Sequence, residues 1–205
     1  MRETEKRFIF EGNDVCLDFI NTEIIDRGKK VDLLSGYREF VSWLAEAGCI
    51  DPGTYERMLG QSGYDHEEIL GGIKSFRTKL RDMAQVISAG KPLRLSHIEL
   101  VNDILRKDTR YSKLILIDCN PRLITHSSSA MSDPRLPIAH AAAELLTKKD
   151  LPLVRKCSNP DCSLFFYDES KNHARRWCSM DRCGNRMKAA LHYNRSRGGR
   201  SVASG

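Results

Sequence analysis

The chain has 205 residues, of which 40% are hydrophobic and 29% charged, and its formal net charge is +6. This composition is typical of a globular protein with a buried core and argues against a fibrous or disordered chain. The first residues lack the apolar run of a secretory signal, and no stretch approaches the roughly 18 apolar residues of a membrane span. We therefore expect a cytoplasmic protein without a membrane partner.

The positive charge is concentrated in the last third of the chain. From residue 151 onward there are 11 Lys and Arg residues and 4 Asp and Glu residues. The first 150 residues hold 22 Lys and Arg residues and 23 Asp and Glu residues. The whole excess of positive charge is therefore C-terminal. A dense positive segment of this kind predicts a polyanionic partner.

The first 60 residues predict a short strand and three helices. A short apolar run at 8–10 favours a strand, and the apolar residues of 15–25 then recur at partly helical spacing after a capping Asn or Asp. A second helix over 36–47 follows a serine and stops at a glycine. A third over 54–59 follows an Asp-Pro pair, which is typical of a helix start.

The middle of the chain predicts two further helices. Apolar residues repeat at intervals of three and four from about residue 65 to 89, where a glycine and a proline end the pattern. Ser96 and Glu99 have the spacing of a capping box, which predicts that the next helix starts there.

A β-hairpin and a last helix complete this half of the sequence. The β-rich runs 111–117 and 122–126 are separated by Asp-Cys-Asn-Pro, whose turn residues predict a hairpin. Pro137 then opens an alanine-rich helix over 138–146. One hairpin among helices predicts an α+β, predominantly helical N-terminal domain.

Four of the seven cysteines form two pairs with metal-ligand spacing. Cys157 and Cys162 are separated by four residues, and Cys178 and Cys183 repeat this spacing after fifteen residues. Two such turns supply four thiolates to a closed, tetrahedral zinc site. An iron–sulfur cluster accepts the same donors, but the sequence carries no redox partner motif, so we expect Zn²⁺.

The segments around these cysteines predict a small zinc-binding fold. An Asn-Pro bend separates the first pair, a strand-like run follows it, and the second pair leads into a helix. This order is the outline of a treble-clef-like finger with four cysteine ligands. We therefore divide the chain into a domain at 1–150, a finger at 151–197 and a flexible tail at 198–205, with the boundary in a short charged segment that contains a proline.

Eight basic residues on the finger loop and the following helix are candidate nucleic-acid contacts. They are Lys171, Arg175, Arg176, Arg182, Arg186, Lys188, Arg195 and Arg197. Arg195 favours a phosphate-facing role, whereas Arg186 lies so close to Cys183 that bracing the zinc loop is the stronger interpretation.

The finger segment resembles a known family. Its run Cys183-Gly184-Asn185-Arg186, with CSNPDC and SKNHARRWC before it, resembles the CGNR zinc finger. The run CLDFINT at 16–22 resembles the start of the ABATE domain, which accompanies this finger and is described as a domain of stress-induced transcription regulators. The resemblance implies zinc on the four cysteines and a role in transcription. DNA binding is expected instead from the basic residues of the finger, which makes a bacterial-type DNA-binding regulator the predicted class.

Asp18, Asn21 and Thr22 are polar residues within an apolar run of the N-terminal domain. Capping or a buried hydrogen-bond network is the favoured interpretation, and a pocket that binds a small effector is the alternative. The apolar helix faces also permit a homodimer.

The sequence contains no local motif of a known catalytic site. It has no nucleophile elbow, phosphate loop, metal-protease helix or dinucleotide fingerprint, so we expect a protein that is not an enzyme. The predicted function is a zinc-binding transcription regulator that contacts DNA through its basic finger. The alternative is a zinc-stapled module that binds a protein or RNA instead.

Overall fold

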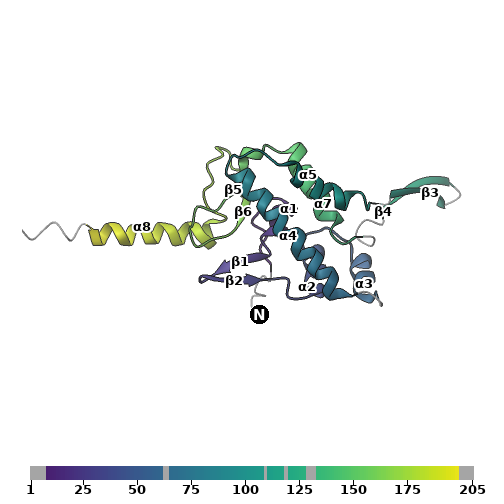
Figure 1. Ribbon diagram of the computed structural model, residues 1–205, viewed down its shortest axis with the longest axis horizontal. Coiled ribbons are helices and arrows are strands. Elements are labelled where there is room, and N and C mark those ends of the chain that lie inside the picture. The colour runs from purple at the N-terminus through teal and green to yellow at the C-terminus, as the bar shows by residue number, and fades with distance from the viewer. Residues whose placement is uncertain (1–7, 62–64, 109, 118–119, 128–132, 199–205) are drawn as a thin grey trace, which may run out of the picture.

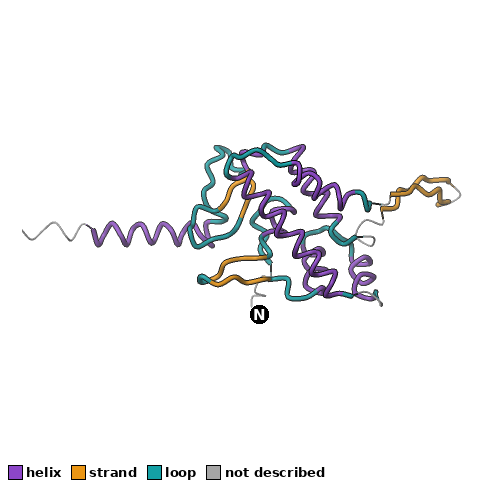
Figure 2. Tube along the Cα trace, viewed as in Figure 1, coloured by secondary structure: helices purple, strands orange, loops and turns teal. Residues whose placement is uncertain are grey.

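Helices dominate the protein, and three antiparallel two-stranded sheets lie apart from one another (Figure 2). The computed structural model describes residues 8–61, 65–108, 110–117, 120–127 and 133–198. Strands β3 (Arg110–Ile117) and β4 (Asn120–Ser127) extend from one end of the helical body, and helix α8 (Asn185–Gly198) extends from the other (Figure 1). The predicted α+β, mainly helical fold is confirmed.

The first helix, α1 (Val15–Ile20), is shorter than the sequence pattern indicated. Asp14 caps it, and its carboxylate accepts a hydrogen bond from the backbone N–H of Cys16 at 2.9 Å. The helix ends at Ile20, so the expected continuation to residue 25 is wrong.

A hairpin that the sequence analysis missed follows α1. Strands β1 (Glu23–Asp26) and β2 (Lys29–Asp32) pair antiparallel. Both residues of the connecting turn, Arg27 and Gly28, have positive φ, 48° and 77°, which suits the twist of a tight hairpin. The branched residues of β1 fit a strand as well as a helix, which explains the wrong prediction. The N-terminal part therefore contains two hairpins rather than one.

The remaining predicted helices are present. They are α2 (Tyr37–Glu46), α3 (Pro52–Gly60), α4 (His66–Ser88), α5 (Leu95–Leu105) and α7 (Leu136–Lys148). The capping box at Ser96 is wrong, because the N-cap of α5 is Arg94, two residues earlier, and the backbone N–H of Arg94 donates to the His97 ring at 3.3 Å. The strand expected at 8–10 is also wrong, since this segment is irregular and places Phe8 in the core.

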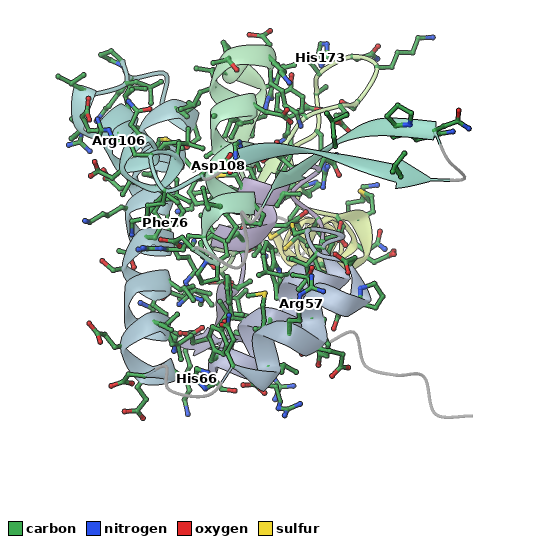
Figure 3. The ribbon with its side chains drawn as sticks, turned by 90° about the vertical axis from the view of Figure 1, so that its right-hand side faces the viewer. Arg57, His66, Phe76, Arg106, Asp108 and His173 are labelled. Atoms are coloured by element: carbon green, nitrogen blue, oxygen red, sulfur yellow. The ribbon has the colours of Figure 1, made fainter. Side chains whose placement is uncertain are left out.

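Helix α4 crosses the body and carries its central apolar stripe. Seen from the side, Phe76 points into the helical body, whereas Arg106, just after α5, points outward (Figure 3). Arg77 on the same helix is only 2% exposed, and its guanidinium donates to Asp32 on β2 through two hydrogen bonds of 2.8 Å. A buried charge paired in this way fixes the β1–β2 hairpin against α4.

The predicted hairpin at 111–126 is confirmed as β3 and β4. Its strands contact chiefly each other, and Figure 1 shows the hairpin extending past the helices. Leu114 and Leu116 on β3 are 68% and 75% exposed. The hairpin therefore presents apolar side chains to solvent.

The C-terminal part packs onto this body. After the short helix η1 (Leu151–Leu153), β5 (Val154–Lys156) and β6 (Phe165–Tyr167) pair antiparallel. Val154 and Phe165 belong to the same apolar core as the helices. A π-helical turn, η2 (Met180–Gly184), then leads into α8. None of the helices among the described residues is long and apolar enough to cross a membrane.

Candidate metal centre and basic surface

The two cysteine pairs meet in one buried cluster. Cys157 follows β5, Cys162 precedes β6 in a turn, Cys178 ends the long loop, and Cys183 lies in η2. Their sulfur atoms all lie within 4.8 Å of one another, and none of the four residues is more than 9% exposed. Two turns that are separate in the sequence are thus brought to the spacing of ligands to one ion.

The spacing of the sulfurs fits zinc. A tetrahedral ion with Zn–S bonds of about 2.3 Å holds its thiolates about 3.8 Å apart. The sulfurs of Cys162 and Cys178 are 3.9 Å apart. Hydrogen bonds from Cys162 and Cys178 lower the pKa of the Cys157 thiol, whereas the contact with Cys157 raises the pKa of the Cys178 thiol. Binding of a metal ion requires that these thiols release their protons. A Zn²⁺ ion held here acts as a cross-link of the finger.

Backbone and amide groups hold the thiolates in place. The N–H of Cys162 donates to the carbonyl of Asn159 at 3.0 Å, which closes the predicted bend. The buried Asn159 side chain donates to the Cys183 sulfur at 3.3 Å, and the N–H of Cys178 donates to the Cys157 sulfur at 3.4 Å. Asn159 therefore links the two cysteine pairs, a role that its turn propensity did not reveal.

The finger is fixed to the N-terminal body by polar contacts. The Asn21 amide donates to the carbonyl of Phe165 at 2.8 Å and accepts from its N–H at 3.0 Å, so it pairs with β6 like a neighbouring strand. Arg81 on α4 donates to the carbonyl of Ser163 at 3.0 Å and to that of Glu23 at 2.6 Å, and it also donates to the carbonyl of Ile20. One guanidinium therefore joins α1, β1 and the finger.

The other two polar residues of the N-terminal run are also engaged inside the protein. The Thr22 hydroxyl donates to the carbonyl of Phe19 at 2.7 Å and accepts from Arg77 at 2.9 Å. The Asp18 carboxylate accepts from the N–H of Gly12 at 2.7 Å. Burial raises the pKa of Asp18 to about 7, although this hydrogen bond acts in the opposite direction. Asp18, Asn21 and Thr22 are therefore all buried and each hydrogen-bonds to other groups of the protein.

The basic residues next to the cluster lie in η2 and on the exposed start of α8. Arg182, Arg186 and Lys188 are all exposed, and the Arg186 guanidinium donates to the carbonyl of Arg182 at 2.7 Å. Arg195 and Arg197 fall further along α8, and their side chains lie outside the described residues. The zinc cluster therefore anchors the base of a cationic helix.

The loop residues divide into internal and exposed groups. Arg175 is half-buried, with its guanidinium 4.3 Å from the centre of the Phe166 ring, and it donates to the carbonyls of Trp177 and Glu11 at 3.0 Å each and to that of Cys178. This side chain braces the loop. Lys171 and Arg176 are exposed.

A helical body joined to a four-cysteine finger defines the chain as a zinc-finger protein with an accessory domain. The model of the CGNR zinc finger matches residues 154–196, and the ABATE model, described as "Putative stress-induced transcription regulator", matches residues 13–149. The chain therefore belongs to the ABATE family and carries a zinc-binding CGNR finger. A search of curated proteins gives no match.

Proposed function

We propose that this protein is a transcription regulator that binds Zn²⁺ through Cys157, Cys162, Cys178 and Cys183 and binds duplex DNA through the finger and α8. The observation that carries this proposal is the position of α8. The helix leaves the body at the zinc cluster and extends away from it, with exposed basic residues in its first turns (Figure 1). A cationic helix held at only one end is accessible to a large polyanion.

The dimensions of α8 suit the major groove of DNA. Its 14 residues span about 21 Å at 1.5 Å per residue. The major groove of B-DNA is about 12 Å wide and admits one α-helix. Ala189 and Ala190 are exposed and small, so the helix can approach base edges closely there.

Phosphate contacts fall to the basic residues at either end of the helix. Arg182, Arg186 and Lys188 lie near its start, and Arg195 and Arg197 lie near its end. Lys171 and Arg176 extend the exposed positive surface onto the loop. Arg175 contributes indirectly, by holding the loop in shape.

DNA binding is tested by titrating zinc-loaded protein into a fluorescent duplex and recording anisotropy at several salt concentrations. Binding through several phosphates weakens steeply with salt, with a slope of about −0.9 per phosphate in a plot of log K against log salt. We expect a steep slope for the natural chain.

Two serine variants separate the zinc site from cysteine loss in general. Cys178→Ser removes a buried sulfur of the cluster, so we expect lost zinc and lost DNA affinity. Cys49→Ser changes a half-buried cysteine outside the cluster and is expected to keep both. If zinc-loaded protein ignores duplex DNA, the DNA proposal is wrong, and binding to single-stranded RNA or to a protein in the same assay identifies the alternative module.

For the N-terminal domain we propose a positioning role. Asn21 contacts the finger directly, Asp18 accepts a hydrogen bond from Gly12, and Thr22 accepts one from Arg77. Their polar atoms are used by backbone groups and Arg77, which supports a structural role better than an effector pocket. We further propose that this protein acts as a regulator without catalysis.

Self-association is the remaining part of the proposal. The apolar helix faces that permitted a dimer are used in the core of one chain. Two strongly exposed apolar side chains, Leu114 and Leu116, lie next to each other on one face of β3. The open strand edge of this hairpin is self-complementary in a two-fold arrangement. A homodimer would also present two copies of α8 to two half-sites.

A further inference from the structure

The turn of the β1–β2 hairpin is an exposed basic feature of the N-terminal body. Every residue from Ile25 to Val31 is exposed, and the turn reads Arg27-Gly28-Lys29-Lys30. Lys30 pairs with Glu23 at 2.9 Å. Within the described part of the chain, Arg27 and Lys29 make no ion pair.

This hairpin is held beside the finger by specific contacts. The backbone N–H of Ile25 donates to the Ser163 hydroxyl at 3.0 Å. Arg81 donates to the carbonyls of both Ser163 and Glu23, so it ties the same two segments together from α4. The hairpin turn and the start of α8 therefore keep a fixed relative position, and Figure 1 shows them side by side.

A hollow of about 280 Å³ separates the hairpin turn from the finger. The hairpin contributes Arg27 and Asp26 to its wall, and the finger contributes Arg182, Arg186 and Asp161. The lining carries three guanidiniums and two carboxylates, and it also includes the cluster residues Cys162 and Cys183. Its volume exceeds several water volumes of about 30 Å³ each, which leaves room for a phosphate group.

We propose that the β1–β2 hairpin is a second DNA contact, with Arg27 and Lys29 binding phosphates of the duplex that α8 enters. This inference rests on the proposed DNA binding and adds a site on the N-terminal body. The duplex backbone carries one negative charge per 1.7 Å or so of helix axis, so a duplex that contacts α8 also offers phosphates to a cationic turn beside that helix. The body thereby fixes the angle at which α8 enters the groove.

The test compares two double variants that remove the same charge. Arg27→Gln with Lys29→Gln removes two positive charges from the hairpin turn. Lys79→Gln with Lys91→Gln removes two from exposed positions on α4 and the turn after it. Because each lost phosphate contact reduces the salt slope by about 1, we expect the hairpin variant to lower the slope by about 2 and the control to leave it unchanged.

The outcomes separate this inference from the proposed function. If the natural chain binds DNA and the two double variants have equal salt slopes, the hairpin contact is overturned and the DNA proposal stays intact. A natural chain that does not bind DNA overturns both. Arg27→Lys with Lys29→Arg keeps both positive charges, so an unchanged salt slope in this variant supports a contact made by charge at this turn.

Discussion

At the scale of one residue, the burial of Asp18 makes the stability of the helical body depend on pH. Its carboxyl group is buried and its pKa is raised to about 7, with Asp14 and Glu11 adding to the increase and Arg175 opposing it. An unfolded Asp titrates near 3.9. Between these two values the folded state binds a proton that the unfolded state has released.

We therefore expect the free energy of unfolding to fall as pH rises from about 4 to 7 because of this group. Asp18→Asn retains an oxygen that accepts from Gly12 and removes the charge, so the variant should gain stability relative to the natural chain above pH 7. The gain is on the order of a few kcal/mol. Urea unfolding of both proteins from pH 5 to about 8 measures it, and parallel curves would contradict the role of Asp18.

The β3–β4 hairpin raises a question at the scale of the element. A two-stranded hairpin is marginally stable in water by itself, and this one exposes Leu114 and Leu116. Pairing with a second copy would give four strands and cover these side chains.

We expect Leu114→Lys with Leu116→Lys to shift the protein from dimer to monomer without loss of helix content. Light scattering after size exclusion measures the mass, and circular dichroism measures the helices. Leu95→Lys is a suitable control, since Leu95 is also 75% exposed but lies on α5. A monomeric natural chain, or a dimer that persists in the double variant, would refute self-association through the hairpin.

At the scale of the whole molecule, the body and the finger share a core. Val154 and Phe165 pack with the helices, and Asn21 and Arg81 bridge the two parts. We propose that the boundary near residue 150 separates a body that positions the finger from a finger that binds DNA. Zinc at the finger should then also stabilise the helical body.

Two tryptophans allow this coupling to be measured. Trp43 is fully buried in the body, and Trp177 is half-buried in the finger. In a Trp177→Phe variant, fluorescence reports the body alone, and we expect removal of zinc by a chelator to lower the urea midpoint of this signal. An unchanged midpoint would show that the two parts unfold independently.

Local patterns predicted most helices because the signals for a helix come from residues that are close together in the sequence. The stripe of α4 and the Asp-Pro start of α3 are such signals, and both helices are present. The prediction for segment 23–32 was wrong because its residues suit a helix or a strand. Its conformation depends on the pair between Asp32 and Arg77 of α4, which are 45 residues apart in the sequence.

The sequence by itself determined the metal chemistry, because two Cys-x4-Cys turns carry their donor atoms and most of their geometry within short segments. It also determined that the positive charge is C-terminal. Only the tertiary structure decided how the basic residues are used: Arg175 is turned inward against Phe166, and the β1–β2 turn is brought beside α8. The reason is physical, since a charge count is a sum over the chain, whereas exposure and proximity depend on which segments pack together.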